Sequence, residues 1–349
     1  MKKALFLCLL SIFIISCKSA VNSNRSSFTS ILIDTLLKDK ISIRAITIDG
    51  DKVYYAANKN RVGYINLKNQ SKFERKINKD SLDLEFRSSA VTMNAVFIVN
   101  VANPAFIFRF SKDLIQKQLV YEEHQEKVFY DSMNFWNDTD GIALSDPTHG
   151  CLSIVLTNDG GKTWYKSPCD GLPKLNEGEA AFAASNTNII IKGTNTWIVS
   201  GGKKARVFYS SDKGISWTAY ETPIVQGEAM TGIFTADFYN DTIGFIAGGN
   251  YEKPNQNFQN KALTTDGGKT WKLVGENTGF GYASCIQFIP NSKGKGLVCV
   301  GSTGLFYSND RGTTWTQLSQ DTSLYTIRFI DDKIAIAAGK DKIIKITFK

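Results

Sequence analysis

The sequence has few of the residue types that metal- and cofactor-dependent enzymes place at their centres. Its 349 residues include only two histidines, His124 and His149. Because histidine is the commonest metal ligand, a histidine-based metal site is not expected. No glycine-rich dinucleotide fingerprint follows a strand and opens a helix, so an oxidoreductase of that type is not supported. We therefore predict neither a metal nor an organic cofactor.

Long blocks of one charge and long apolar runs are also missing from the body of the chain. The formal charge is +8, but the lysines are scattered among acidic residues. This pattern is typical of a solvated, mildly basic surface, so no nucleic-acid partner is expected. The only long apolar run lies at the N-terminus, in "MKKALFLCLLSIFIISC".

This N-terminal run predicts export and a lipid anchor. Two lysines, an apolar stretch and a small residue before a cysteine have the layout of a secretory signal peptide over residues 1–16. The last residues resemble a bacterial lipobox, which implies lipidation of Cys17, a tether over 17–26 and attachment to the cell envelope. A plain signal peptide cut elsewhere, or a short anchor, is the alternative. Lys18 favours the outer membrane, and 27–349 is predicted to be a single domain.

Four cysteines remain in the body of the chain, and export permits them to form disulfides. Cys151 and Cys169 are equidistant from Gly160, and Cys285 and Cys299 from Ser292, both in turn-like sequences. If each turn joins neighbouring strands, the two members of a pair face one another. Both pairs are candidate disulfides, with free buried thiols as the alternative.

An eight-residue pattern occurs four times between residues 157 and 315. The copies are "TNDGGKTW" (157–164), "SSDKGISW" (210–217), "TTDGGKTW" (264–271) and "SNDRGTTW" (308–315). Self-similarity with a period near 50 residues is the signature of a propeller, solenoid or array. Around each copy, four short β-rich runs follow one another, and the copy is the turn between the third and fourth.

One four-stranded sheet per repeat predicts an all-β fold, a seven-bladed β-propeller. Residues 43–77 and 86–121 keep the four-strand rhythm without the motif. The last segment, 324–348, supplies only three strands, so we expect the strand at 27–37 to pair with it and close the ring. Six blades is the alternative count.

The recurring motif suits a tight hairpin. Glycine takes backbone angles closed to other residues, the aspartate accepts hydrogen bonds within its own loop, and the tryptophan packs between sheets. The motif resembles the Asp-box, or BNR repeat, in which these turns lie opposite the binding face. The residues assigned this structural role are Asp159, Gly161, Trp164, Asp212, Gly214, Trp217, Asp266, Gly268, Trp271, Asp310, Gly312 and Trp315.

The face away from the motifs is therefore the predicted binding face. Aligning the starts of the innermost strands, and adding one residue of the long 250–260 loop, gives a polar rim. The rim candidates are Arg44, Arg87, Tyr130, Glu179, Tyr251, Tyr282 and Tyr325. Such a rim suits an anionic or polar partner; the alternative is ordinary polar strand ends. The carboxylates that an enzyme would use are Glu179, Glu228 and Asp146.

Asp-boxes also suggest a sialidase, but the set of three arginines with an early Arg-Ile-Pro signature is not present in a chain with nine arginines. Nearly the whole mature chain, including "FWNDTDGIALSDPTHGCLSIVLTNDGGKTW", is similar to bacterial propellers of the photosystem II assembly-factor-like group. That resemblance implies a non-catalytic binding role at a membrane surface. We expect a monomer with a protein or glycan partner. A sialidase-like glycoside hydrolase, or another carbohydrate-active enzyme, is the alternative.

Overall fold

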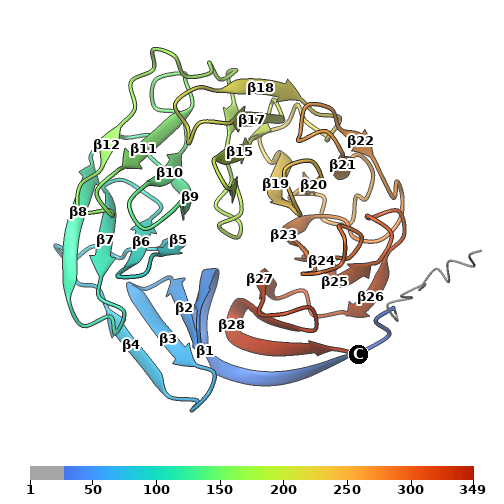
Figure 1. Cartoon of the computed structure of the whole chain (residues 1–349), viewed down its shortest axis with the longest axis horizontal. Coiled ribbons are helices and arrows are strands. Elements are labelled where there is room, and N and C mark those ends of the chain that lie inside the picture. The colour runs from blue at the N-terminus through green and yellow to red at the C-terminus, as the bar shows by residue number, and fades with distance from the viewer. Residues whose placement is uncertain (1–26) are drawn as a thin grey trace, which may run out of the picture.

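The computed structural model describes residues 27–349, which form 28 strands and no helix. The strands radiate around a central axis as antiparallel sheets (Figure 1). The predicted signal peptide, Cys17 and the tether lie outside the described residues. In residues 27–349 no helix offers a long apolar stretch of the kind that crosses a bilayer. The fold is a β-propeller, as the repeats predict.

Four of the sheets are regular four-stranded blades. The first contains β5 (Phe86–Val91), β6 (Val96–Asn100), β7 (Ala105–Phe110) and β8 (Lys117–Glu123). The second contains β9 (Tyr130–Phe135), β10 (Gly141–Ser145), β11 (Ser153–Thr157) and β12 (Tyr165–Lys166). The third contains β14 (Ile189–Lys192), β15 (Asn195–Val199), β17 (Arg206–Ser210) and β18 (Thr218–Glu221). The fourth contains β23 (Ala283–Phe288), β24 (Leu297–Gly301), β25 (Gly304–Ser308) and β26 (Thr316–Ser319).

A fifth sheet gains two short strands from its neighbour. Its main strands are β19 (Thr231–Phe238), β20 (Gly244–Asn250), β21 (Lys261–Thr264) and β22 (Lys272–Leu273). Two further strands extend it on the inner side, β16 (Gly201–Gly202) and β13 (Glu179–Ala180). The contact between β16 and β19 is a single pair of glycines, Gly201 and Gly232, where backbones approach too closely for a side chain.

The sixth sheet closes the ring. Its order is β27 (Leu324–Phe329), β28 (Ile334–Phe348), β1 (Ile31–Asp49), β2 (Lys52–Ala57), β3 (Arg61–Asn66) and β4 (Lys72–Lys76). The first part of β1 pairs with β28, from Ile31 opposite Phe348 onward, and its last part pairs with β2. The N-terminal strand therefore joins the C-terminal strands, as predicted.

The continuous strand β1 also decides the blade count. The repeat predicted as a seventh blade does not form a separate sheet, because β1 runs without a break from β28 to β2. Counted as hydrogen-bonded sheets, residues 27–349 contain six, which is the alternative count, because the first and last repeats share the strand β1 and merge into one sheet.

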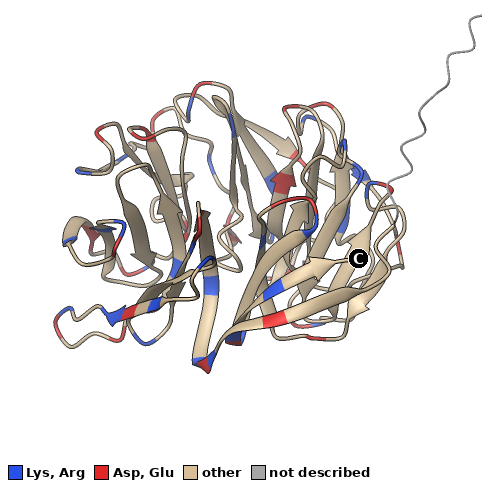
Figure 2. Ribbon diagram, turned by 60° about the horizontal axis from the view of Figure 1, so that its bottom comes forward, with Lys and Arg blue, Asp and Glu red and all other residues tan. Residues whose placement is uncertain are grey.

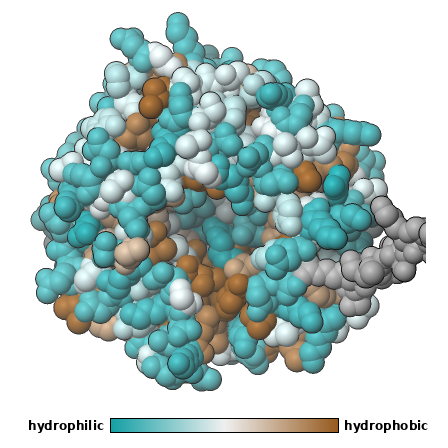
Figure 3. Space-filling view, in the orientation of Figure 1, coloured by the Kyte–Doolittle hydropathy of each residue, from teal (hydrophilic) through white to brown (hydrophobic). Residues whose placement is uncertain are grey.

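Apolar side chains fill the spaces between neighbouring blades. Every residue of the second strands β6, β10, β20 and β24 is buried, because both faces of each sheet are covered. Charged residues of both signs occupy the loops and outer edges (Figure 2). The face shown in Figure 3 is hollowed at its centre, and hydrophobic side chains gather beside the hollow over β1, β27 and β28. The core thus consists of layers between rigid sheets.

The repeated motif folds as its chemistry predicts. Asp159 Oδ1 accepts the amides of Lys162 and Thr163 at 2.9 and 3.0 Å, and Thr157 Oγ1 accepts the amide of Gly161 at 3.0 Å. The other three copies repeat the bonds around Asp212, Asp266 and Asp310. Gly161 has a φ of +70°, and a Cβ there would lie 2.2 Å from the Phe97 ring. These turns follow the third strand of a blade, so they lie opposite the starts of the innermost strands.

The two candidate cysteine pairs differ. Cys151 and Cys169 form a disulfide, with Cα atoms 5.7 Å apart. Cys285 and Cys299 are free and buried, so the second candidate pair is wrong. A β-bulge between residues 283 and 285 places Val300 opposite Cys285 and Ile286 opposite Cys299. The two thiols consequently point to opposite faces of the sheet, into different core clusters.

Candidate functional site

The mouth of the ring is built by β-bulges near the starts of the innermost strands. A bulge adds one unpaired residue to a strand and redirects its side chain. The register shifts in β1, β5, β9, β19, β23 and β27 each leave one such residue. We call these residues the bulge ring: Arg44, Arg87, Asp131, Phe234, Ser284 and Tyr325. The fold therefore brings six chain-distant side chains to one end of the central axis.

Residues 182–187, which precede β14, form a plug on the axis. In Figure 1, the part of the chain around β15 reaches furthest toward the centre of the ring. Hydrogen bonds join the plug to the innermost strands of all the other repeats. They involve Arg44 of β1, Ser88 of β5, Met133 of β9, Thr235 of β19, Ser284 of β23 and Arg328 of β27. The plug gives the mouth a fixed floor.

Arg44 is the half-buried cation of the bulge ring. Its guanidinium carbon lies 4.2 Å from the centroid of the Tyr325 ring, a distance typical of a cation–π contact. Nη1 donates to the plug carbonyl of Ala184 at 3.2 Å, and the buried Nε has no hydrogen-bond partner in residues 27–349. Within the same residues no carboxylate forms an ion pair with Arg44. The guanidinium is positioned by the fold and keeps donors available.

Aromatic rings form the wall next to Arg44. Phe182 of the plug stacks on Phe234 with centroids 3.9 Å apart, and Tyr282 meets Phe234 edge-on at 4.8 Å. Tyr251, on the long loop after β20, lies 5.1 Å from Tyr282 and is 47% exposed. Burial raises the pKa of Tyr282, so its hydroxyl stays protonated at neutral pH. This wall offers flat apolar surface beside a cation.

Acidic groups lie on the Arg87 side of the mouth. Arg87 Nε donates to Glu85 at 2.8 Å. Asp131 is fully buried, and neither carboxylate oxygen has a hydrogen-bond partner in the described part of the chain. Burial and then the charge of Asp146 raise the pKa of Asp131 well above its usual value, against a lowering by Arg87. Burial also raises the pKa of Asp146 to about 7. The hydrogen bond that Asp146 accepts from the Ala181 amide lowers this pKa, but by less.

The predicted rim residues are divided between the mouth and the interior. Arg44, Arg87 and Tyr325 lie in the bulge ring, and Tyr251 and Tyr282 lie in the aromatic wall. Tyr130 points elsewhere: it is buried and its hydroxyl donates to Glu123 at 2.8 Å. The next residue, Asp131, takes the ring position.

Glu179, a candidate for both rim and catalysis, lies in a buried clamp. Its oxygens accept hydrogen bonds from Arg206 Nε and Nη2 at 2.9 and 2.7 Å, and from Ser200 Oγ at 2.7 Å. Burial alone raises the pKa of Glu179, but the bonds from Arg206 and Asn176 outweigh it and hold the pKa below its usual value. The carboxylate is ionised and fully bonded, which fits a structural role rather than the rim position.

The other catalytic candidates do not form a pair with Glu179. Glu228 is exposed beside the long loop, where it accepts Asn250 Nδ2 at 2.9 Å. Asp146 interacts instead with Asp131, which sequence reasoning missed. Phe182 and Phe234 were also not selected from the sequence as mouth residues. Phe234 is brought to the mouth by the β-bulge between Ile233 and Thr235. In residues 27–349 no cluster of three or more His, Cys, Asp or Glu side chains is placed to hold a metal ion.

The six sheets, the central axis and the bulge ring define the class: an all-β propeller with one polar, partly aromatic mouth. No protein-family model matches the sequence, and no curated protein does. Solved structures share the fold. A structure titled "YCF48 bound to D1 peptide" is 13% identical with a TM-score of 0.63 over 93% of this chain and 98% of that one. YCF48 from Cyanidioschyzon merolae is 12% identical with a TM-score of 0.63, covering 90% and 98%. A streptogramin B lyase is 16% identical with a TM-score of 0.67, covering 93% and 100%.

Proposed function

We propose that the protein is a non-catalytic binding protein that holds a peptide segment of a protein partner at the mouth of the propeller. The observation that carries this proposal is Arg44, a half-buried guanidinium fixed on Tyr325 that forms no ion pair with a carboxylate of residues 27–349. A guanidinium with free donors suits a carboxylate of a partner. The similarity to a propeller whose title describes a bound peptide supports a peptide as the occupant.

The aromatic wall fits the same occupant. Phe182 and Tyr251 offer exposed ring surface within the same mouth as Arg44. Aromatic and arginine side chains are the residues that most often dominate protein interfaces. A peptide that carries an acidic group next to an apolar or aromatic side chain would use both. A glycan is the other occupant that aromatic rings and polar groups suit, and it is an outcome of the test below.

We expect Arg44→Ala to weaken peptide binding at least tenfold, because a charge-assisted hydrogen bond contributes roughly 1.5–3 kcal/mol. The purified protein is used to select peptides from a displayed random library, and the selected peptides are then measured by fluorescence anisotropy. Lys162→Ala, on a motif turn at the opposite face, is the matched control and should bind as the wild type does.

A second assay separates binding from catalysis. The same protein is incubated with fluorogenic glycosides and sialosides, alone and as Asp146→Asn. Turnover that disappears in Asp146→Asn would replace the binding proposal with the glycosidase alternative. Equal peptide affinity of wild type and Arg44→Ala would also contradict the proposal.

We further propose that the protein is an Asp-box lipoprotein of the cell envelope, anchored through Cys17 and placed in the outer membrane. The supporting observations are the N-terminal sequence and the four motif turns, in each of which the aspartate accepts an amide of its own loop. Metabolic labelling with a palmitate analogue should label the wild type and not Cys17→Ser. Equal labelling of both would contradict the anchor.

A further inference from the structure

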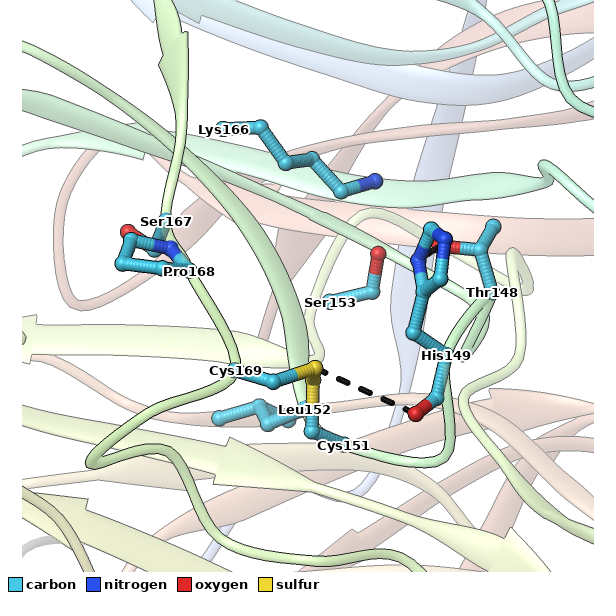
Figure 4. Close-up of a pocket in the computed structure, with 9 residues that line it drawn as sticks. All are labelled: Thr148, His149, Cys151, Leu152, Ser153, Lys166, Ser167, Pro168 and Cys169. Atoms are coloured by element: carbon cyan, nitrogen blue, oxygen red, sulfur yellow. Dashed lines mark hydrogen bonds between the residues drawn. A yellow bond between two sulfur atoms is a disulfide. The ribbon is translucent and has the colours of Figure 1, made fainter.

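A cavity of about 520 Å³ lies on the outer part of the β9–β12 blade, beside the Cys151–Cys169 disulfide (Figure 4). It is separate from the bulge ring and shares no residue with it. Small-molecule sites in proteins typically have volumes of roughly 300–1,000 Å³. The cavity is therefore large enough for a small organic ligand.

Two chain segments are fastened together to make the cavity. Thr148 and His149 come from the long loop after β10, and Ser153 and Lys166 come from β11 and β12. The disulfide joins the end of that loop to the segment after β12. Next to the disulfide, the Leu152 amide donates to the Pro173 carbonyl at 2.9 Å. The walls are consequently held in place without a ligand.

The polar groups that line the cavity are mainly hydrogen-bond donors. Ser153 is only 3% exposed, and its Oγ has no hydrogen-bond partner in residues 27–349. A buried hydroxyl without a partner is unfavourable, so this group points to a ligand atom. Lys166 Nζ lies 2.6 Å from Glu123 Oε1. This ion pair uses one of the three N–H groups of Lys166 and leaves two.

His149 adds a ring nitrogen to this set. Its Nδ1 is 2.9 Å from Thr148 Oγ1, and when Nδ1 accepts the Thr148 hydroxyl, Nε2 carries the proton and can donate. In Figure 4 the ammonium of Lys166, the hydroxyl of Ser153 and the ring of His149 turn toward the same space above the disulfide. No aspartate or glutamate is among the residues that line the cavity. Because Glu123 already pairs with Lys166 beside the cavity, the two remaining N–H groups of Lys166, rather than a net positive charge, favour a group that accepts hydrogen bonds, such as a carboxylate.

The remaining wall is apolar. Leu152, Pro168 and the disulfide sulfurs supply surface that cannot hydrogen-bond strongly. We propose that this cavity binds a small organic carboxylate, with the carboxylate at Lys166, His149 and Ser153 and an apolar body against Leu152, Pro168 and the disulfide. This site is independent of the peptide-binding proposal.

Titration calorimetry with the purified chain tests the site, using phenylacetate as the probe. Phenylacetate carries both a carboxylate and an apolar body, whereas acetate and benzyl alcohol each lack one of them. We expect phenylacetate to bind at least tenfold more tightly than either. Failure to detect saturable phenylacetate binding, or equal affinity for benzyl alcohol, would overturn the proposal.

Variants locate the binding. Lys166→Met should weaken phenylacetate about tenfold, as expected for the loss of one charge-assisted hydrogen bond, and Lys166→Arg should retain most of the affinity. Ser153→Ala, which removes one buried oxygen and leaves no ion pair broken, should weaken binding at least threefold. Lys162→Met on the same blade and Arg44→Ala at the mouth should bind as the wild type does. Loss of binding in Arg44→Ala, with none in Lys166→Met or Ser153→Ala, would place the ligand at the mouth and overturn the proposal.

Discussion

Glu179→Ala is expected to lower the free energy of unfolding by about 3–5 kcal/mol, the usual cost of leaving one partner of a buried ion pair uncompensated. The Glu179 side chain is fully buried and that of Arg206 is 12% exposed. Without the carboxylate, five donor groups of three residues, Asn176, Ser200 and Arg206, lose their acceptor. Urea unfolding followed by circular dichroism measures the change, and Glu177→Ala on the exposed neighbouring residue is the control.

A double variant distinguishes the charge from the packing. Glu179→Leu combined with Arg206→Met removes both charges and should cost clearly less than the sum of the two single changes. Because the folded-state pKa of Glu179 is lowered, its contribution is present above its usual value of 4.5 and is lost as the pH falls through the folded value. If Glu179→Ala unfolds at the same urea concentration as the wild type, the clamp interpretation is wrong.

Asp131→Asn is expected to have the opposite effect, raising the free energy of unfolding at pH 8 by about 1–3 kcal/mol, because each unit by which burial raises a carboxyl pKa corresponds to about 1.4 kcal/mol and asparagine carries no charge. Asparagine keeps the shape of the side chain and removes the charge that burial and Asp146 disfavour. Unfolding in urea at pH 4 and pH 8 measures the effect. Asp170→Asn, on an exposed aspartate of the same blade, should change neither value.

The pH dependence follows from the raised pKa values. A carboxyl whose folded-state pKa exceeds its unfolded value of 3.8 contributes stability that is fully present below 3.8 and is lost as the pH rises through the folded value. For Asp146 that loss is expected between about pH 4 and pH 7. Asp131→Asn should therefore be close to wild type at pH 4 and more stable at pH 8. A variant that is less stable than the wild type at pH 8 would show that the carboxylate has a partner.

The sequence predicted the features that depend on local pattern. The hydrogen bonds that hold each hairpin lie within eight residues. The same residue types therefore recur in every copy, and the repeats can be recognised from the sequence. The closure by the N-terminal strand followed from counting strands, since a repeat with three strands needs a fourth. The pairing of Cys151 with Cys169 agrees with their equal distance to Gly160, although the strand ladder between them ends at Lys166 and the backbone of Cys151 pairs with Lys174.

Features that depend on one-residue shifts or distant contacts were not predictable in the same way. A bulge places Val300 opposite Cys285, which separates two thiols that simple symmetry would join. Another bulge turns Tyr130 inward and gives the ring position to Asp131. Arg206 is 27 residues from Glu179, and no periodic pattern indicates that they meet. The plug departs from the strand rhythm, so its contacts appear only in three dimensions.

The closing sheet also constrains when this domain can finish folding. Residues 31–38 are the first part of the domain to be made, and their partners are residues 342–348, the last. A chain that emerges N-terminus first, from a ribosome or through a membrane pore, keeps that first strand unpaired until its final residues have emerged. Completion is therefore a single late event, and during the wait the exposed strand edge is open to pairing with other chains. Loss of a few C-terminal residues would open the ring instead of shortening it.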